Sequence, residues 1–192
     1  TPKENVFDVT LDIIDDPVEI KRINNFYKST ANGSHVSFRL KIIRVYKLHL
    51  QAMAEDFESG KKCGNVMELW HGTKKANLLS ILKSGLKCSP PNTAAIAGKM
   101  FGNGIYFSDQ STKSLNYAYG YWDGKYEKDC FMLLNQVAMG KAYTPRSYNE
   151  SFPKAGYDST FAKGGFSGVS NNEMIVYKNN QVNITHLVEF EE

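Results

Sequence analysis

Residues 104–117 constrain the fold more than any other stretch of this 192-residue sequence. Ile105 to Phe107 form an apolar run typical of a short strand, and a polar stretch typical of a helix start follows directly. On that helix, Ser114 and Tyr117 lie three residues apart and therefore on one face. The run predicts a strand–helix junction with a hydroxyl and two aromatic rings around one small space. Such a space suits a flat, polar heteroaromatic ring, although tyrosines packed into the core would give the same pattern.

Hydrophobic periodicity predicts an α+β fold with a mainly antiparallel sheet, because helices are interspersed in the first half and strands dominate the second. Helices are expected from Pro17, after an Asp16 cap, to about residue 32, over 49–59, over 77–82 with Gly85 as the C-cap, and from about residue 111. Strands are expected over 36–48, 67–70, 105–107, 131–139, 173–177 and 183–190. The glycine-rich stretch 140–170 has little periodicity, so no element is expected there.

Length and charge favour one globular domain spanning residues 1–192. The net charge of +3 is small, and no run of basic residues is longer than two. We therefore expect neither nucleic-acid binding nor membrane binding by this domain, and we expect a monomer.

Cysteine usage and the start of the chain bear on its compartment. The three cysteines lie far apart, with no CxxC pair and no histidine at metal-ligand spacing. This pattern favours reduced thiols in an intracellular setting, nuclear or cytoplasmic, and argues against a metal site. No stretch reaches the length of a transmembrane helix, and the first residues do not form a signal peptide. A chain that begins at Thr1 without a methionine indicates a fragment or a processed protein.

Two polar residues stand at the ends of apolar strands, where side chains project into clefts. His71 follows the 67–70 strand, and Gly72 beside it permits close approach of a ligand to the backbone. Glu173 opens another strand, where its carboxylate can accept a hydrogen bond from a sugar hydroxyl and counter the charge of an oxocarbenium-like transition state. The alternatives are a structural histidine and a solvated acid at a strand end.

Together these features form a constellation in four separated segments that follow one another in a fixed order. The segments are 69–73 (LWHGT), 100–107 (MFGNGIYF), 111–117 (STKSLNY) and 172–177 (NEMIVY). They closely resemble the poly(ADP-ribose) polymerase (PARP) catalytic domain, and their order and spacing fit its histidine–tyrosine–glutamate signature. The resemblance spans nearly the whole chain. It implies an ADP-ribosyltransferase-like fold, with a split, mainly antiparallel sheet flanked by helices and a cleft for NAD+.

The resemblance assigns the nicotinamide end of NAD+ to five residues. His71 would bind a ribose hydroxyl, and Gly72, through its backbone, would hold the carboxamide together with the Ser114 hydroxyl. Tyr117 would stack on the nicotinamide ring, and Tyr106 would line the opposite side. By this resemblance, NAD+ is a substrate and no metal takes part.

Further roles follow from the same resemblance. Glu173 would be the catalytic glutamate, supported by His71 and Tyr106, with Lys113 close to it. The adenosine half would lie against Thr73, Asn77 and Lys87, where lysine replaces a common arginine. Met100 would face the acceptor side. The loop 89–99 would cover the donor site, and the loop 163–169 would shape the acceptor side.

The implied activity is transfer of ADP-ribose from NAD+ to an acceptor, either a protein or a growing ADP-ribose chain, with release of nicotinamide. A glutamate at position 173 permits chain elongation, so we favour polymer formation over single transfer. Three alternatives remain: a mono-ADP-ribosyltransferase, an NAD+ glycohydrolase, and a catalytically silent module that binds NAD+ or ADP-ribose. The regulatory helical domain and the DNA-binding segments of DNA-damage-responsive members are not found in this sequence.

Overall fold

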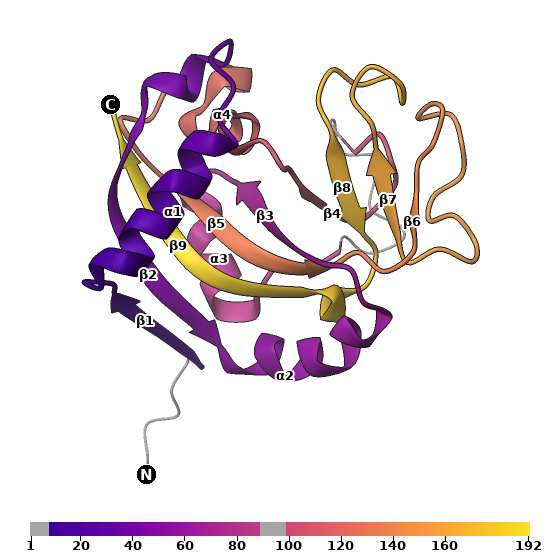
Figure 1. Ribbon diagram of the computed structural model, residues 1–192, viewed down its shortest axis with the longest axis horizontal. Coiled ribbons are helices and arrows are strands. Elements are labelled where there is room, and N and C mark those ends of the chain that lie inside the picture. The colour runs from indigo at the N-terminus through magenta and orange to yellow at the C-terminus, as the bar shows by residue number, and fades with distance from the viewer. Residues whose placement is uncertain (1–7, 89–98) are drawn as a thin grey trace.

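Two β-sheets joined at one corner form the framework of the fold (Figure 1). The computed structural model describes residues 8–88 and 99–192, so the expected donor-site loop lies outside the described residues except for Lys99. The larger sheet has five strands, all antiparallel, in the order β1-β2-β9-β5-β3. These strands are β1 (Val9–Ile13), β2 (Lys41–Leu50), β9 (Val182–Glu191), β5 (Asp129–Ala138) and β3 (Val66–Gly72).

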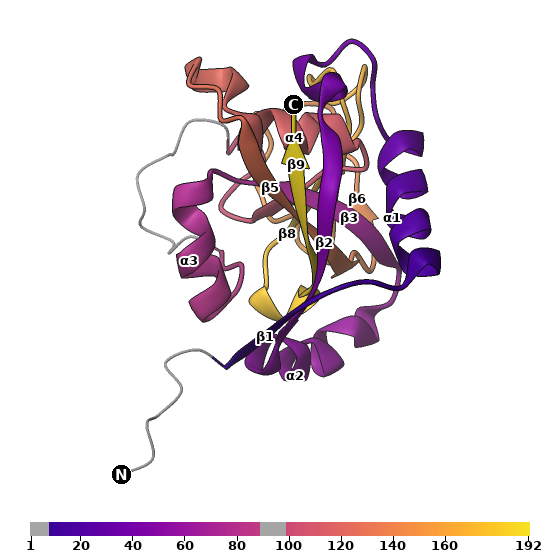
Figure 2. The same cartoon turned by 90° about the vertical axis from the view of Figure 1, so that its left-hand side faces the viewer.

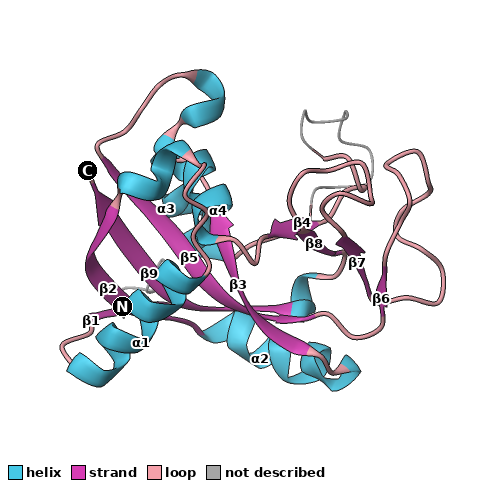
Figure 3. Cartoon of the chain, turned by 45° about the horizontal axis from the view of Figure 1, so that its top comes forward, coloured by secondary structure: helices cyan, strands magenta, loops and turns pink. Residues whose placement is uncertain are grey.

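The smaller sheet has four strands in the order β4-β8-β7-β6, and only its β6–β7 pair is parallel. Its strands are β4 (Ile105–Phe107), β8 (Glu173–Val176), β7 (Ser159–Ala162) and β6 (Ala142–Tyr143). Long loops connect β6 to β7 and β7 to β8 (Figure 3). The two sheets meet at an antiparallel bridge, where Trp70 and Ser108 exchange two backbone hydrogen bonds of 3.0 Å.

Helices cover both faces of the larger sheet (Figure 2). Within residues 8–88 and 99–192, the α-helices are α1 (Pro17–Ser29), α2 (Gln51–Gly60), α3 (Lys75–Ser84) and α4 (Ser111–Tyr119). Short 3₁₀ turns in the same ranges lie at Val36–Arg39, Lys61–Cys63, Tyr121–Asp123 and Asn179–Gln181. Ile23 of α1 and Leu115 of α4 share one buried cluster with Trp70. Leu78 of α3 belongs to the cluster on the opposite face. The α+β class expected from the sequence is thus confirmed.

The expected strand over 36–48 is wrong at its beginning, because residues 36–39 form a 3₁₀ turn and the strand runs from Lys41 to Leu50. Tertiary hydrogen bonds explain the difference. The Ser37 backbone amide donates to Asn116 Oδ1 at 3.1 Å, and the Ser37 hydroxyl donates to the Thr112 carbonyl at 2.8 Å. Both partners lie on α4, 75 residues or more away, so no local pattern could reveal this turn.

Other differences lie at edges and in loops. The edge strand β1 was not expected, and α2 begins two residues later than predicted, because His49 and Leu50 still belong to β2. The stretch 140–170 contains the short strands β6 and β7, whose pairing partners are distant in sequence. Among the described residues, no helix has the length and apolarity needed to cross a membrane.

The start of α1 is the local feature that the sequence predicted most directly. Asp16 accepts a hydrogen bond of 3.0 Å from the Val18 backbone amide, and Pro17 occupies the first helical position. The carboxylate satisfies one of the amides that a helix start leaves without a partner.

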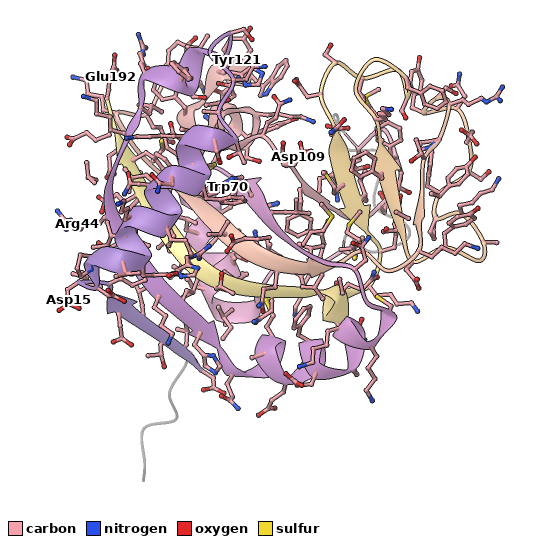
Figure 4. The ribbon with its side chains drawn as sticks, in the orientation of Figure 1. Asp15, Arg44, Trp70, Asp109, Tyr121 and Glu192 are labelled. Atoms are coloured by element: carbon pink, nitrogen blue, oxygen red, sulfur yellow. The ribbon has the colours of Figure 1, made fainter. Side chains whose placement is uncertain are left out.

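Replacing this cap should weaken the fold. We expect Asp16→Ala to lower the free energy of unfolding by about 1 kcal/mol, measured by urea denaturation. The matched control is Asp15→Ala, which removes an exposed carboxylate at the same end of α1 (Figure 4). Equal effects of the two variants would contradict the capping role of Asp16.

Candidate active site

A cleft of about 660 Å³ opens where β3, α3, β4 and α4 converge. All the site residues predicted from the sequence except Met100 line it, and Met100 is 39% exposed outside it. The lining members are His71, Gly72, Thr73, Asn77, Lys87, Tyr106, Lys113, Ser114, Tyr117 and Glu173. The fold therefore brings together residues spread over more than one hundred positions of the chain.

A hydrogen bond to β4 sets the tautomer of His71, which lies near the end of β3. Its Nδ1 lies 2.7 Å from the carbonyl oxygen of Tyr106 and must carry the hydrogen, because a carbonyl can only accept. Burial lowers the pKa of His71, so the imidazole is neutral near pH 7. Nε2 therefore keeps a free lone pair, which suits it to accept a hydrogen bond from a ligand hydroxyl.

Gly72 brings the end of β3 into direct contact with the backbone of α4. A Cβ atom built at this position would lie 1.7 Å from the Ser114 carbonyl oxygen, so no other residue fits. The Ser114 hydroxyl lies 3.3 Å from the Trp70 carbonyl, to which it donates, and its oxygen can still accept. Gly72 and Ser114 thus present backbone and hydroxyl groups side by side in the cleft.

The two tyrosines of the cleft differ in how firmly they are held. The Tyr106 hydroxyl donates to the Gly102 carbonyl at 2.7 Å and accepts from the Phe101 amide at 2.9 Å, which fixes its ring. Burial raises the pKa of Tyr106, so the hydroxyl stays protonated. Tyr117 is 43% exposed, and its ring lies 6.0 Å from that of Trp122.

A charged pair, Lys113 and Glu173, lines the cleft. Lys113 Nζ lies 2.9 Å from Glu173 Oε1, and the two side chains are only 15% and 14% exposed. Burial lowers the pKa of Lys113, and the neighbouring carboxylate of Glu173 opposes this shift. The second oxygen, Glu173 Oε2, is buried and has no hydrogen-bond partner among the described residues. Since buried carboxylate oxygens are normally paired, this oxygen is the acceptor that a ligand hydroxyl would satisfy.

Comparison with known proteins identifies the family. The model of the poly(ADP-ribose) polymerase catalytic domain matches residues 18–192. The chain belongs to this family.

Similar curated proteins carry the same family name. The chain is 28% identical over 201 residues to poly [ADP-ribose] polymerase 1 of Gallus gallus, which covers 90% of this chain and 20% of that protein. It is 38% identical over 122 residues to poly [ADP-ribose] polymerase of Drosophila melanogaster, covering 64% and 12% of the two chains. For poly [ADP-ribose] polymerase 2-A of Oryza sativa subsp. japonica, identity is 33% over 123 residues, covering 64% and 18%. The chain thus spans a fifth or less of the length of these relatives.

The outer part of the cleft in this PARP catalytic domain is formed largely by α3. Asn77 donates to the Thr73 hydroxyl at 3.1 Å, and Lys87 lies beyond the end of the helix. Sequence reasoning missed Ser80 and Ser84, which also line this wall. Their spacing from Asn77, three and seven residues, places all three on one helix face, and this periodicity was the signal that could have revealed them.

Further residues line the cleft that were not predicted as site residues, most of them apolar or glycine. This set comprises Ile81, Gly85, Leu86, Lys99, Gly104, Ile105, Phe107 and Ser108. In the described parts of the chain, no cluster of three or more histidine, cysteine, aspartate or glutamate side chains could hold a metal ion.

Adding a methyl group at the β3–α4 contact should distort the cleft. We expect Gly72→Ala to lower the free energy of unfolding by roughly 1–3 kcal/mol, because the new atom collides with main-chain atoms that cannot move aside easily. Gly33→Ala is the matched control, since its added atom would meet nothing closer than 4.0 Å. Denaturant titration of both variants measures the effect, and a Gly72→Ala variant as stable as the control would refute the close contact.

Three partly buried histidines should make the free energy of unfolding sensitive to acid. Burial lowers the pKa values of His35, His71 and His186 below the usual 6.5. Below about pH 6.5 the unfolded chain therefore binds more protons than the folded one, and the free energy of unfolding should fall as the pH drops.

The His71→Asn variant isolates the contribution of His71 to this pH dependence of the free energy of unfolding. Between about pH 7.5 and pH 5, His71→Asn should lose less free energy of unfolding than the wild type, because it removes one such histidine. Replacing the exposed His49 in the same way serves as the control and should keep the slope of the wild type. An unchanged slope in His71→Asn would show that His71 is not held neutral by burial.

Proposed function

We propose that this chain binds NAD+ in the cleft, transfers its ADP-ribose unit to an acceptor and releases nicotinamide. The observation that carries the proposal is the carboxylate of Glu173. Its Oε1 is paired with Lys113, and its Oε2 has no hydrogen-bond partner among the described residues. The same cleft contains His71, Ser114 and Tyr117. Membership of the PARP catalytic domain family supports the same reaction.

The nicotinamide end of the substrate would bind between β3, β4 and α4. The Gly72 backbone and the Ser114 hydroxyl face the same space and can hold a carboxamide by hydrogen bonds. Tyr117 is free to stack on the pyridinium ring, and Tyr106, fixed by its two hydrogen bonds, forms the opposite wall. These hydrogen bonds and the ring stacking orient the nicotinamide leaving group along the bond that breaks.

The ribose next to nicotinamide would lie between His71 and Glu173. Nε2 of His71 and Oε2 of Glu173 are both acceptors without a partner among the described residues, which suits two ribose hydroxyls. The bond between C1′ and the nicotinamide nitrogen breaks, and nicotinamide leaves with the electron pair. The carboxylate stabilises the oxocarbenium character of the ribose and accepts or orients the proton of the incoming nucleophile. Lys113 keeps the carboxylate oriented through Oε1.

The adenosine half would extend along the wall formed by α3. Thr73, Asn77 and Lys87 supply a hydroxyl, an amide and a cation there, and Ser80 and Ser84 add two hydroxyls. A few cations are enough for attraction to the pyrophosphate without a large basic patch, which agrees with the small net charge of +3.

For the acceptor, we propose a protein side chain first and then the terminal ribose of a growing chain. Glu173 can orient a ribose hydroxyl as well as a protein nucleophile, so the site permits elongation. The loop 163–169 and Met100 are the proposed acceptor-side elements. We also propose that the protein acts inside the cell as a monomer, in the nucleus or cytoplasm, which the three free cysteines support.

Incubation with labelled NAD+, followed by gel electrophoresis and a nicotinamide assay, tests the proposal. A ladder of labelled protein means polymer formation, and a sharp band means single transfer. Free ADP-ribose without labelled protein would indicate an NAD+ glycohydrolase. If no nicotinamide is released, the chain is a silent binding module and the proposed function is wrong.

Removing the carboxylate charge should stop the chemistry and spare the binding. We expect Glu173→Gln to lower kcat roughly 100-fold or more while the KM for NAD+ changes little, because the lost interaction strengthens only as charge develops. Glu191→Gln, an exposed glutamate at the end of β9, is the matched control. Steady-state release of nicotinamide measures both constants, and a Glu173→Gln variant with full activity would overturn the assignment.

A further inference from the structure

A polar network lies behind the Lys113–Glu173 pair, and none of the roles above explains it. At its centre is Asn172, the residue that precedes Glu173 at the start of β8. Its backbone carbonyl accepts a hydrogen bond of 3.1 Å from Lys113 Nζ, so Lys113 divides its donors between Asn172 and Glu173. The position of the Asn172 peptide therefore helps to set where the lysine, and with it the carboxylate, is held.

The side chain of Asn172 is fixed at both ends of its amide. Nδ2 donates to Asp109 Oδ2 at 2.9 Å, and Oδ1 accepts from the Gly164 backbone amide at 2.9 Å. Because an amide nitrogen only donates and its oxygen only accepts, these two bonds allow one orientation of the group. The bond to Asp109 is also strengthened by the negative charge of the carboxylate.

The two partners come from different parts of the fold. Asp109 lies on the connection between β4 and α4, between the two sheets in Figure 4. Gly164 belongs to the loop that follows β7, and a Cβ atom there would lie 2.7 Å from the Ser170 carbonyl. This close approach lets the loop press against the backbone just before Asn172.

The loop is itself a closed unit. Gly165 donates to the Val169 carbonyl at 2.8 Å, and the Ser167 hydroxyl accepts from the Lys163 backbone amide at 2.9 Å. Gly164 thus belongs to a loop held together by its own hydrogen bonds, and Asn172 joins this loop to the β4–α4 connection.

We infer that Asn172 is a positioning residue. Its side chain connects the 163–169 loop and Asp109 to the start of β8, where Glu173 lies. These contacts hold the Lys113–Glu173 pair in the geometry that ADP-ribose transfer requires. This inference rests on the proposed function. It assigns Asn172 no contact with NAD+, and the nicotinamide-binding groups Gly72, Ser114 and Tyr117 do not touch it in any hydrogen bond of the described residues. Its loss should therefore act on kcat and leave the KM for NAD+ nearly unchanged.

Exchanging the amide and the carboxylate gives a sharp test. Asn172→Asp alone places two carboxylates against each other, and we expect kcat to fall roughly 10- to 100-fold, because small misplacements of catalytic groups have effects of this size. The double variant Asp109→Asn/Asn172→Asp restores the hydrogen bond with donor and acceptor exchanged, keeps an acceptor for the Gly164 amide and conserves the net charge. It should recover most of the lost kcat.

The pH dependence separates positioning from simple loss of structure. In the Asn172→Asp single variant, acid lets the two facing carboxylates share a proton and relieves their repulsion. The ratio of its kcat to that of the wild type should therefore rise as the pH falls, whereas the ratio for the double variant should stay flat. Asp109 and Glu173 are the carboxylates that act on the charge of Lys113, so the double variant, which keeps one carboxylate in the Asp109–Asn172 pair, is the reference for the single variant, which has two.

The experiment measures nicotinamide release by the wild type, the single variant, the double variant and Asn183→Ala between about pH 7.5 and pH 5. Thermal melting of each protein shows whether it is folded. Asn183 is the matched control, since its amide makes one exposed hydrogen bond, to Gln136 on the neighbouring strand β5. If the wild type is active, two results would overturn the inference and leave the proposed function standing. One is a normal kcat in Asn172→Asp, and the other is a folded double variant that recovers none of the lost kcat. A wild type that releases no nicotinamide would instead refute the proposed function, and the inference with it.

Discussion

The contact between the end of β3 and the backbone of α4 is the constraint on which the rest of the site depends. The Trp70–Ser108 bridge joins the two sheets, and Gly72 comes so close to Ser114 that a single methyl group would collide with its carbonyl. This contact splits the β-structure into two sheets at an angle rather than one continuous surface. The cleft opens beside that corner, and Gly72, Ser108 and Ser114 line it.

The largely buried Lys113–Glu173 ion pair is better explained by the orientation it gives the carboxylate than by a gain in the free energy of unfolding. Removing two charges from water costs free energy that their mutual attraction repays only with good geometry and full hydrogen bonding. Here one oxygen of Glu173 is paired with Lys113 and the other has no partner among the described residues. A carboxylate held at one oxygen and unpaired at the other keeps one acceptor for a further hydrogen bond, as the proposed function requires.

Local patterns predicted those parts of the structure whose causes are local. The Asp16 cap, the short strand 105–107 and the helix that follows it were expected from neighbouring residues, and all three are present. The 3₁₀ turn at 36–39 was missed, because Ser37 is bonded to α4 rather than to its own neighbours. For the same reason local patterns indicate no element over 140–170, since β6 and β7 exist only through pairing with each other and with β8.

The sequence by itself determined the types of chemical group in the site and their order along the chain, because hydroxyl, imidazole and carboxylate groups occur in four recognisable segments. It also determined the α+β class, since periodicities of two and of three to four residues can be read from neighbours. Only the tertiary structure decided which groups meet, which nitrogen of His71 carries the proton, and which oxygen of Glu173 lacks a partner. It also brought Asn172 between Asp109 and Gly164. These features depend on hydrogen bonds between residues far apart in the chain, and such bonds leave no periodic mark in the sequence.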